Sequence, residues 1–222
     1  MVKIAPSILA GDHGRLAAEA LNAENWGADW IHVDIMDGRF APNLTFGPGA
    51  VRSLRKVVTI PLDCHLMLDA PERYAEKFLE AGADIVTVHA EAVNPQTLDS
   101  IGKIVKRYGK GLGIAFKPAT PLSLIGLQET ELALVIVMTV NPGFSGQKFM
   151  PEVVPKIREA SSMFRSLKRH VEIEVDGGVD LSNAKLIIEN GGTVLVAGNS
   201  VFGQKDPELA IKELKNVVGT IA

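Results

Sequence analysis

Short apolar runs rich in β-branched residues alternate with longer amphipathic segments along the whole chain. A buried strand needs only a short apolar run, whereas a helix repeats its apolar positions once per turn, so the alternation predicts strands separated by helices. The runs that predict strands are residues 4–9, 30–35, 62–66, 85–89, 111–116, 134–140, 171–175 and 194–197. The segments that most clearly predict helices are residues 15–25, 71–81, 95–108, 153–164, 181–189 and 208–218.

The order of these elements indicates the fold class. Strands that alternate with helices form a parallel sheet with helical crossovers. Eight such units fill the 222 residues, with no linker or low-complexity segment between them. We therefore predict an α/β protein, a single-domain (β/α)8 TIM barrel over residues 1–222, with an open doubly wound sheet as the structural alternative.

Composition and charge exclude several classes of partner. The net charge is −3 and no long basic run occurs, which argues against nucleic acid, because backbone binding needs clustered Lys and Arg. No apolar run approaches the roughly 20 residues that span a bilayer, and the first residues lack the apolar core of a signal peptide. The single cysteine, Cys64, precludes an intrachain disulfide. We expect a cytoplasmic protein without a membrane partner.

The ends of the predicted strands carry polar side chains in a repeated pattern. In a βα barrel, function is found at the carboxyl ends of the strands. His32, Asp34 and Met36 end the second strand, and they share one face because strand side chains alternate. The third strand ends in His65 and Met67, and the seventh ends in Asp176.

Two histidines and two aspartates from strand ends are able to converge on the barrel mouth. Such a mixed nitrogen and oxygen set suits one divalent ion of Zn, Mn, Co or Fe(II) better than Mg or Ca. The alternative is that His32 and His65 are core histidines satisfied by backbone groups. The repeated pattern favours the metal site, and a buried carboxylate without a partner would be costly at Asp34 and Asp176.

Three methionines, Met36, Met67 and Met138, also close strands. Each on its own fits ordinary packing. Together at the barrel mouth, beside the same carboxylates, they indicate a water-poor lining that would strengthen electrostatic interactions around a charged intermediate.

Glycine-rich loops follow the last three strands. Residues 141–147 follow the sixth strand, Gly177 and Gly178 the seventh, and Gly198 and Asn199 the eighth. Glycines let backbone N–H groups approach a phosphate closely, and barrel enzymes often hold phosphate in this region. We therefore expect a phosphorylated substrate. Residues 141–148 also join Pro and Gly hinges to an apolar tip at Phe144, and we predict that this segment closes over the substrate.

Taken together, these motifs resemble one known family. H-x-D-x-M-D-G at residues 32–38, H-x-M at 65–67, N-P-G-F-x-G-Q at 141–147 and V-D-G-G at 175–178 are similar to those of the ribulose-phosphate 3-epimerases. The resemblance runs from Ile4 to about Phe202.

The resemblance implies a role for each matching residue. It implies that His32, Asp34, His65 and Asp176 hold one divalent metal ion, that Asp34 and Asp176 form the acid/base pair, and that no organic cofactor is used. It also implies a small phosphorylated ketose as the substrate, and it implies that the protein is an enzyme rather than a binding module. The implied substrate contacts are Ser7, Met36, His65, Met67, Met138, Gly143, Phe144, Ser145, Gly146, Gly177, Gly178, Gly198 and Asn199.

The chain departs from the family pattern at a few positions. Ser145 stands where Gly is usual, and Asn199-Ser200 where Ser-Ala is common. Both changes keep hydrogen-bonding groups, so they affect only details of the phosphate site. Related decarboxylases carry D-x-K-x-x-D after an early strand, and Met36 occupies that Lys position here.

The implied reaction inverts carbon 3 of a 2-keto sugar phosphate. One carboxylate would remove a proton from one face and the other would return a proton to the opposite face, while the metal stabilises the cis-enediolate. Three alternatives remain: an epimerase for the six-carbon D-allulose 6-phosphate, a decarboxylase or aldolase using Lys117, and a non-enzymatic phosphate- or metal-binding module. We also expect a homo-oligomer.

Overall fold

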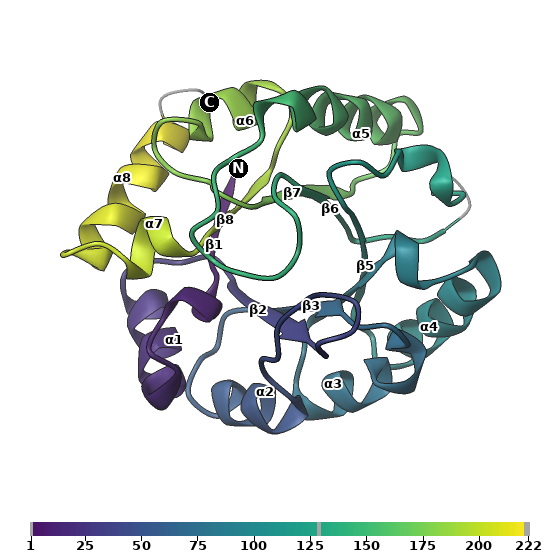
Figure 1. Cartoon of the computed structure of the whole chain (residues 1–222), viewed down its shortest axis with the longest axis horizontal. Coiled ribbons are helices and arrows are strands. Elements are labelled where there is room, and N and C mark those ends of the chain that lie inside the picture. Colours follow the sequence, from purple (N-terminus) through teal and green to yellow (C-terminus); the bar gives the residue numbers. More distant parts are fainter. Residues whose placement is uncertain (1, 128–129, 220–222) are drawn as a thin grey trace.

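Eight parallel strands form a ring in the computed structural model, which describes residues 2–127 and 130–219 (Figure 1). All eight predicted strands are present, and the predicted TIM barrel is confirmed. The strands are β1 (Lys3–Pro6), β2 (Ile31–Met36), β3 (Leu62–Met67), β4 (Ile85–His89), β5 (Gly111–Phe116), β6 (Leu134–Met138), β7 (Glu172–Asp176) and β8 (Val194–Ala197).

The barrel closes between its first and second strands. From β2 to β8 each strand pairs with its neighbours in the sequence, and β8 pairs in turn with β1. β1 and β2 complete the ring through a parallel bridge between Ser7 and His32, and the backbone N–H of Asp29 donates to the carbonyl of Ile4 at 2.9 Å. Residues of the first and last strands therefore face the same interior as those of β2 and β3.

Helices surround the strands in a single outer layer (Figure 1). They are α1 (Leu16–Asn25), α2 (Pro48–Arg55), α3 (Ala75–Ala81), α4 (Pro95–Arg107), α5 (Val154–Ser166), α6 (Ala184–Glu189), α7 (Asn199–Phe202) and α8 (Pro207–Gly219). The sequence pattern did not predict α2 or α7. The first is only 8 residues long and the second 4, so neither repeats an apolar stripe often enough to be recognised.

Several predicted boundaries were wrong for local reasons. The first strand ends at Pro6 rather than at residue 9, because the Ser7 hydroxyl accepts the N–H of Leu9 and starts a 3₁₀ turn at Ile8–Ala10. The sixth strand ends at Met138 rather than at residue 140. The helix expected from Pro71 begins with a 3₁₀ turn, and α3 starts at Ala75.

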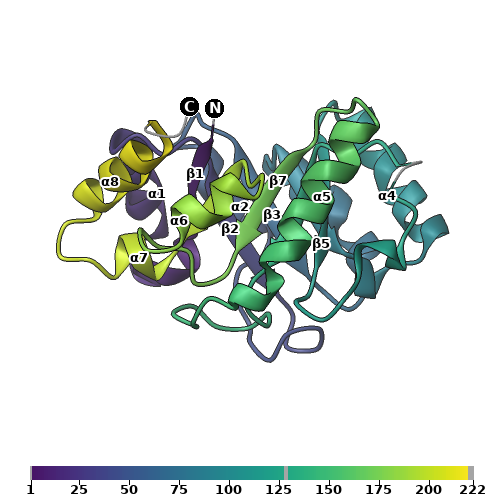
Figure 2. The ribbon, with the colours of Figure 1, turned by 90° about the horizontal axis from the view of Figure 1, so that it is seen from above.

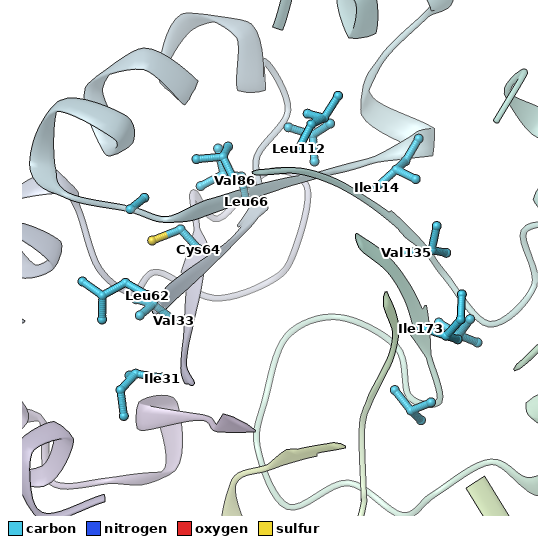
Figure 3. Packing of buried hydrophobic residues seen from close by; sticks show 14 of the residues in the cluster. Ile31, Val33, Leu62, Cys64, Leu66, Val86, Leu112, Ile114, Val135 and Ile173 are labelled. Atoms are coloured by element: carbon cyan, nitrogen blue, oxygen red, sulfur yellow. The ribbon is translucent and has the colours of Figure 1, made fainter. Parts of the chain in front are cut away.

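Alternating side chains divide the core into two layers. Outward-facing residues of the strands pack under the helices, as Figure 3 shows for Ile31, Val33, Leu62, Cys64 and Leu66. The interior holds a separate apolar cluster whose members include Ala5, Leu134, Ile136, Met138, Val194 and Val196. The interior also holds buried polar residues from β2, β3, β4 and β7, which are His32, Asp34, Asp63, His65, Thr87, His89 and Glu174. Apolar and polar side chains therefore share the barrel interior.

The loops that follow β2 and β6 lie together at one end of the barrel (Figure 2). This is the end at which the parallel strands finish, so the polar residues at the ends of β2, β3 and β7 open toward these loops. Among the described residues, no helix is long and apolar enough to cross a membrane.

Candidate active site

A cleft of about 530 Å³ opens at the carboxyl ends of the strands. Most of the residues proposed from the sequence line it. These are Ser7, Asp34, Met36, Met67, Met138, Gly143, Phe144, Ser145, Gly146, Asp176, Gly177, Gly178, Gly198 and Asn199. The two histidines, His32 and His65, do not line the cleft but lie fully buried behind its carboxylates.

The four residues predicted to hold a metal do come together. Each of His32, Asp34, His65 and Asp176 offers one ligand atom, and these atoms lie within 4.8 Å of one another. Asp34 Oδ1 is 3.3 Å from His32 Nε2 and 3.4 Å from His65 Nδ1. His65 Nδ1 is also 3.6 Å from Asp176 Oδ2. Register explains part of this proximity, because Asp34 pairs directly with His65 across β2 and β3.

The donor set fits a divalent cation. His65 Nδ1 is buried, faces two carboxylates and makes no hydrogen bond. If His65 Nδ1 carries a proton, that proton has no well-aligned acceptor. If His65 Nδ1 is unprotonated, its lone pair is free, and a bound cation would satisfy it. Two imidazole nitrogens and two carboxylate oxygens are the ligands that zinc and similar ions prefer.

The two aspartates differ in their electrostatic surroundings. Burial opposes the ionisation of Asp34, but the charge and hydrogen bond of His32, together with His65, outweigh it and hold the pKa of Asp34 well below its usual value. Burial and the neighbouring Asp34 carboxylate raise the pKa of Asp176 to about 6. One carboxylate is therefore ionised at neutral pH, and the other takes up a proton close to neutral pH.

The His32 ring is contacted by the carboxylates of Asp63 and Glu174, to which the sequence analysis assigned no role. Its Nδ1 lies 2.7 Å from Asp63 Oδ2 and 3.1 Å from Glu174 Oε1. Burial alone would lower the pKa of His32, but the carboxylates of Asp34, Glu174 and Asp63 outweigh it and raise that pKa well above the ordinary value. Burial and the charge of Asp63 raise the pKa of Glu174 well above its usual value.

The alternation of side chains along a strand would have located both Asp63 and Glu174 in the barrel interior. Asp63 precedes His65 by two positions and Glu174 precedes Asp176 by two, so each faces the barrel interior one layer below a predicted ligand. Nothing local to either residue shows that its carboxylate meets His32.

His65 is likewise supported by residues that sequence reasoning missed. Its Nε2 lies 2.9 Å from Nε2 of His89, at the end of β4, and His89 Nδ1 lies 3.0 Å from Glu91 Oε2. Burial lowers the pKa of His89 to about 4. Burial opposes the ionisation of Glu91, but the hydrogen bonds from His89 and Thr120 outweigh it and lower the pKa of Glu91 to about 2.

The glycine loops meet on one rim of the cleft and are tied to one another. The Ser200 hydroxyl donates to the carbonyl of Val179 at 2.6 Å, and Asn183 Nδ2 donates to the carbonyl of Gly178 at 2.9 Å. Gly178 has a φ of +65°, and a Cβ there would lie 2.4 Å from the backbone nitrogen of Phe149. Only glycine therefore lets the β7 loop pack this closely against the β6 loop.

The loop after β6 covers part of the cleft. Gln147 Nε2 donates to the carbonyls of Asn141 and Phe144, at 2.8 and 2.9 Å, which holds the loop in a compact turn. Asn43, in the loop after β2, donates its side-chain N–H to the carbonyl of Gly143 at 2.8 Å. The Phe144 side chain is 58% exposed at the tip.

Sequence comparison decides which family this site belongs to. A profile described as the ribulose-phosphate 3 epimerase family matches residues 3–202 of the chain. The chain belongs to the ribulose-phosphate 3-epimerase family. Membership makes it an isomerase, and the resemblance seen in the strand-end motifs is confirmed.

Relatives in this epimerase family match the chain over nearly its whole length. Ribulose-phosphate 3-epimerase of Bacillus subtilis strain 168 is 47% identical over 216 residues, which cover 97% of this chain and 99% of the relative. Ribulose-5-phosphate-3-epimerase, chloroplastic, of Arabidopsis thaliana is 45% identical over 212 residues, covering 96% of this chain and 75% of the relative. Ribulose-phosphate 3-epimerase, cytoplasmic isoform, of Oryza sativa subsp. japonica is 43% identical over 219 residues, covering 97% and 94%.

Solved structures outside the epimerase family share its fold. A crystal structure of 3-hexulose-6-phosphate synthase superposes with a TM-score of 0.66 at 20% identity, covering 97% of this chain and 99% of the other. That of 3-keto-L-gulonate-6-phosphate decarboxylase from Vibrio cholerae O1 biovar El Tor reaches 0.75 at 17% identity, covering 100% and 99%. At these identities the likeness concerns the fold alone.

The lysine considered for decarboxylase or aldolase chemistry lies away from the epimerase cleft. The Lys117 ammonium lies over the ring of Phe40, 3.8 Å from its centroid. Lys117 is not among the residues that line the cleft, whereas Met36, at the position of the decarboxylase lysine, is. The cleft therefore lacks a lysine at the two positions considered for decarboxylase or aldolase chemistry, Met36 and Lys117.

Proposed function

We propose that this protein interconverts D-ribulose 5-phosphate and D-xylulose 5-phosphate by moving a proton at carbon 3. The observation that carries the proposal is the pair Asp34 and Asp176, which border one cleft from β2 and β7 with their pKa values held apart. Two carboxylates with separated pKa values are what a paired base and acid require.

One divalent metal ion would complete the site. His32 Nε2, His65 Nδ1 and one oxygen each of Asp34 and Asp176 would hold it, and Zn, Fe(II), Mn and Co suit this donor set. When bound, such an ion supplies Lewis acidity that stabilises negative charge on the C2 and C3 oxygens of the ketose. The proposed reaction needs no organic cofactor, because no electrons leave the substrate.

The aspartates carry the proton steps. Asp34, at the end of β2, would accept the carbon-3 proton on one face of the substrate. Asp176, at the end of β7, would return a proton to the opposite face. The roles exchange in the reverse reaction, and the cis-enediolate is the species between the two transfers.

The remaining cleft residues bind the substrate and exclude water. Met36, Met67 and Met138 give the cleft an apolar wall beside the carboxylates, which strengthens their interaction with a charged intermediate. The loops with Gly143, Phe144, Ser145, Gly146, Gly177, Gly178, Gly198 and Asn199 would bind the phosphate through backbone and side-chain donors. His65 would contribute through the metal. The expected homo-oligomer and cytoplasmic location stay predictions.

An epimerisation assay tests the proposal. Purified protein is offered D-ribulose 5-phosphate or D-allulose 6-phosphate, before chelator treatment, after it, and after Zn, Mn, Co or Fe(II) is added back. We expect the five-carbon substrate to turn over at least tenfold faster, with activity lost on chelation and restored by metal. Faster turnover of the six-carbon substrate would contradict the substrate assignment. No turnover of either substrate with any metal would overturn the epimerase function.

A further inference from the structure

His65 is contacted on both ring nitrogens by groups of different kinds. Its Nδ1 faces Asp34 and Asp176, as described above, while its Nε2 lies 2.9 Å from Nε2 of His89. The two ring planes are nearly parallel, inclined by 23°, and their centroids lie 4.9 Å apart, which leaves the two Nε2 atoms facing each other. Neither imidazole is exposed to solvent. The orientation of the His65 ring is therefore determined largely by His89.

A hydrogen bond between two imidazole nitrogens contains a single proton. One ring must donate and the other must accept, because two facing N–H groups repel each other and two facing lone pairs form no bond. To offer Nδ1 as a metal ligand, neutral His65 must carry its proton on Nε2. His89 must then accept that proton's hydrogen bond with an unprotonated Nε2, which places the proton of neutral His89 on Nδ1.

Glu91 determines the direction of the hydrogen bonds that join His65, His89 and Glu91. Its Oε2 lies 3.0 Å from His89 Nδ1, and an ionised carboxylate only accepts hydrogen bonds. Its other oxygen, Oε1, accepts the backbone N–H of Lys117 at 2.8 Å, which anchors the carboxylate at the start of the loop after β5. The backbone thus fixes the acceptor at the Glu91 end of this series of hydrogen bonds, and the donor and acceptor of each other bond follow from it.

The opposite arrangement fits the geometry poorly. A proton on His65 Nδ1 would point toward Asp34 Oδ1 at 3.4 Å and Asp176 Oδ2 at 3.6 Å, yet His65 Nδ1 makes no hydrogen bond. Facing the carboxylate of Glu91, an unprotonated His89 Nδ1 would place two acceptors against each other. Only the chain that runs from His65 through His89 to Glu91 pairs every donor with an acceptor.

We propose that His89 and Glu91 are positioning residues that make His65 a metal ligand through Nδ1. The Glu91 carboxylate sets the tautomer of His89, and His89 sets the tautomer and ring orientation of His65. The inference rests on the metal site of the proposed function. Partners of this kind contribute about 10- to 100-fold to metal affinity, because they fix the ligand and raise its basicity.

The zinc affinity of the protein, measured by competition with a chromophoric chelator, tests the proposed series of hydrogen bonds from His65 through His89 to Glu91 (the relay). We expect Glu91→Ala and His89→Leu to bind Zn²⁺ about 10- to 100-fold more weakly than the unmodified chain. His89→Gln keeps a side-chain carbonyl that accepts from His65 Nε2, so its affinity should fall only a few-fold. Matched controls are Glu189→Ala and His170→Leu, two exposed residues outside the cleft, which should leave the affinity unchanged.

Two results separate failure of the relay from failure of the metal site. Equal zinc affinity in the unmodified chain, Glu91→Ala and His89→Leu would overturn the relay while leaving the metal site intact. No zinc binding by the unmodified chain would overturn the proposed metal site and the relay with it.

Nuclear magnetic resonance gives a readout that does not depend on a variant folding. Long-range proton–nitrogen correlation spectra of the zinc-loaded chain report which ring nitrogen of each histidine carries a proton. We expect protons on His65 Nε2 and His89 Nδ1, with the His65 Nδ1 resonance shifted by the metal. A proton on His65 Nδ1, or a metal shift on His65 Nε2, would overturn the proposal.

Discussion

The Ser7 hydroxyl donates to Asp34 Oδ2 at 2.6 Å, in the interior of the barrel. Ser7 also forms the parallel bridge to His32 that closes the ring between β1 and β2. One oxygen of Asp34 is therefore occupied by a neutral donor, and the other, Oδ1, is turned toward His32 and His65. The position at which the barrel closes thus also sets the orientation of the proposed base.

Removal of the Ser7 hydroxyl should impair catalysis more than folding. Ser7→Ala leaves Asp34 Oδ2 without its donor, and a buried hydrogen bond to a charged group contributes about 1.5–3 kcal/mol. We expect kcat/KM to fall by about tenfold or more, and Tm to fall by no more than the roughly 3–12 °C that about 1.5–3 kcal/mol corresponds to in a chain of this size. Ser53→Ala removes a hydroxyl that donates within α2 on the exposed surface, and its kinetics should be unchanged. Equal kcat/KM in both variants would contradict a role for Ser7.

Separate roles for Asp34 and Asp176 predict a defined isotope pattern. Asp34→Asn and Asp176→Asn should each lower epimerisation by a factor of about a hundred or more, the scale of a lost acid/base group. In heavy water, the unmodified enzyme should put solvent deuterium into the product, with little in recovered substrate at early times. Substantial direct transfer of the carbon-3 hydrogen to product would contradict the assignment of the two steps to different carboxylates.

The close packing of the glycine loops predicts a sharp contrast between two glycines. In Gly178→Ala, the new methyl group meets the Phe149 backbone in a left-handed conformation that costs about 1–2 kcal/mol, so the β6 loop must move. We expect KM for the sugar phosphate to rise at least tenfold. Gly49→Ala is a suitable control, because its Cβ meets nothing within 4 Å inside α2. An unchanged KM in Gly178→Ala would argue against phosphate binding at this rim.

The link between the β2 and β6 loops should affect closure over the substrate. Asn43→Ala removes the hydrogen bond to the Gly143 carbonyl, which contributes about 1 kcal/mol. We expect a several-fold higher KM and faster proteolysis at residues 141–148 in the absence of substrate. Asn25→Ala, at the end of α1, supplies the control. Identical proteolysis with and without substrate in the unmodified enzyme would contradict the predicted lid.

Glu172 should make stability depend on acid pH at the other end of the barrel. Burial alone would raise the pKa of Glu172, but its ion pair with Lys3 and the hydroxyl of Thr193 outweigh it, so that pKa lies below 4.5. The resulting stability is present above the unfolded pKa and is lost as pH falls through the folded pKa.

Glu172→Gln isolates this contribution. At pH 7 the variant should unfold a few degrees below the unmodified chain, for a loss of about 1 kcal/mol. The difference in Tm should begin to shrink below the unfolded pKa of about 4.3 and vanish below the lowered folded pKa, where the Glu172 carboxyl and the amide that replaces it are both neutral. A difference that stays constant between pH 7 and pH 3 would contradict the lowered pKa.

The sequence by itself determined the fold class and the family, and it located most residues of the candidate site. Apolar runs of strand length, separated by amphipathic segments, require buried parallel strands under helices, whatever their final arrangement. The alternation of side chains placed His32, Asp34 and Met36 on one face, and the position at the strand end placed that face at the mouth. These inferences are local, so the printed sequence was sufficient for them.

The tertiary structure decided which buried groups meet. Asp63, Glu174, His89 and Glu91 lie near predicted ligands in sequence, but their contacts depend on barrel closure and on the register between strands. The opposite pKa shifts of Asp34 and Asp176 depend on burial and on neighbouring charges from other strands. Such interactions fall off within a few ångströms, and only folding brings residues so far apart in sequence to that distance.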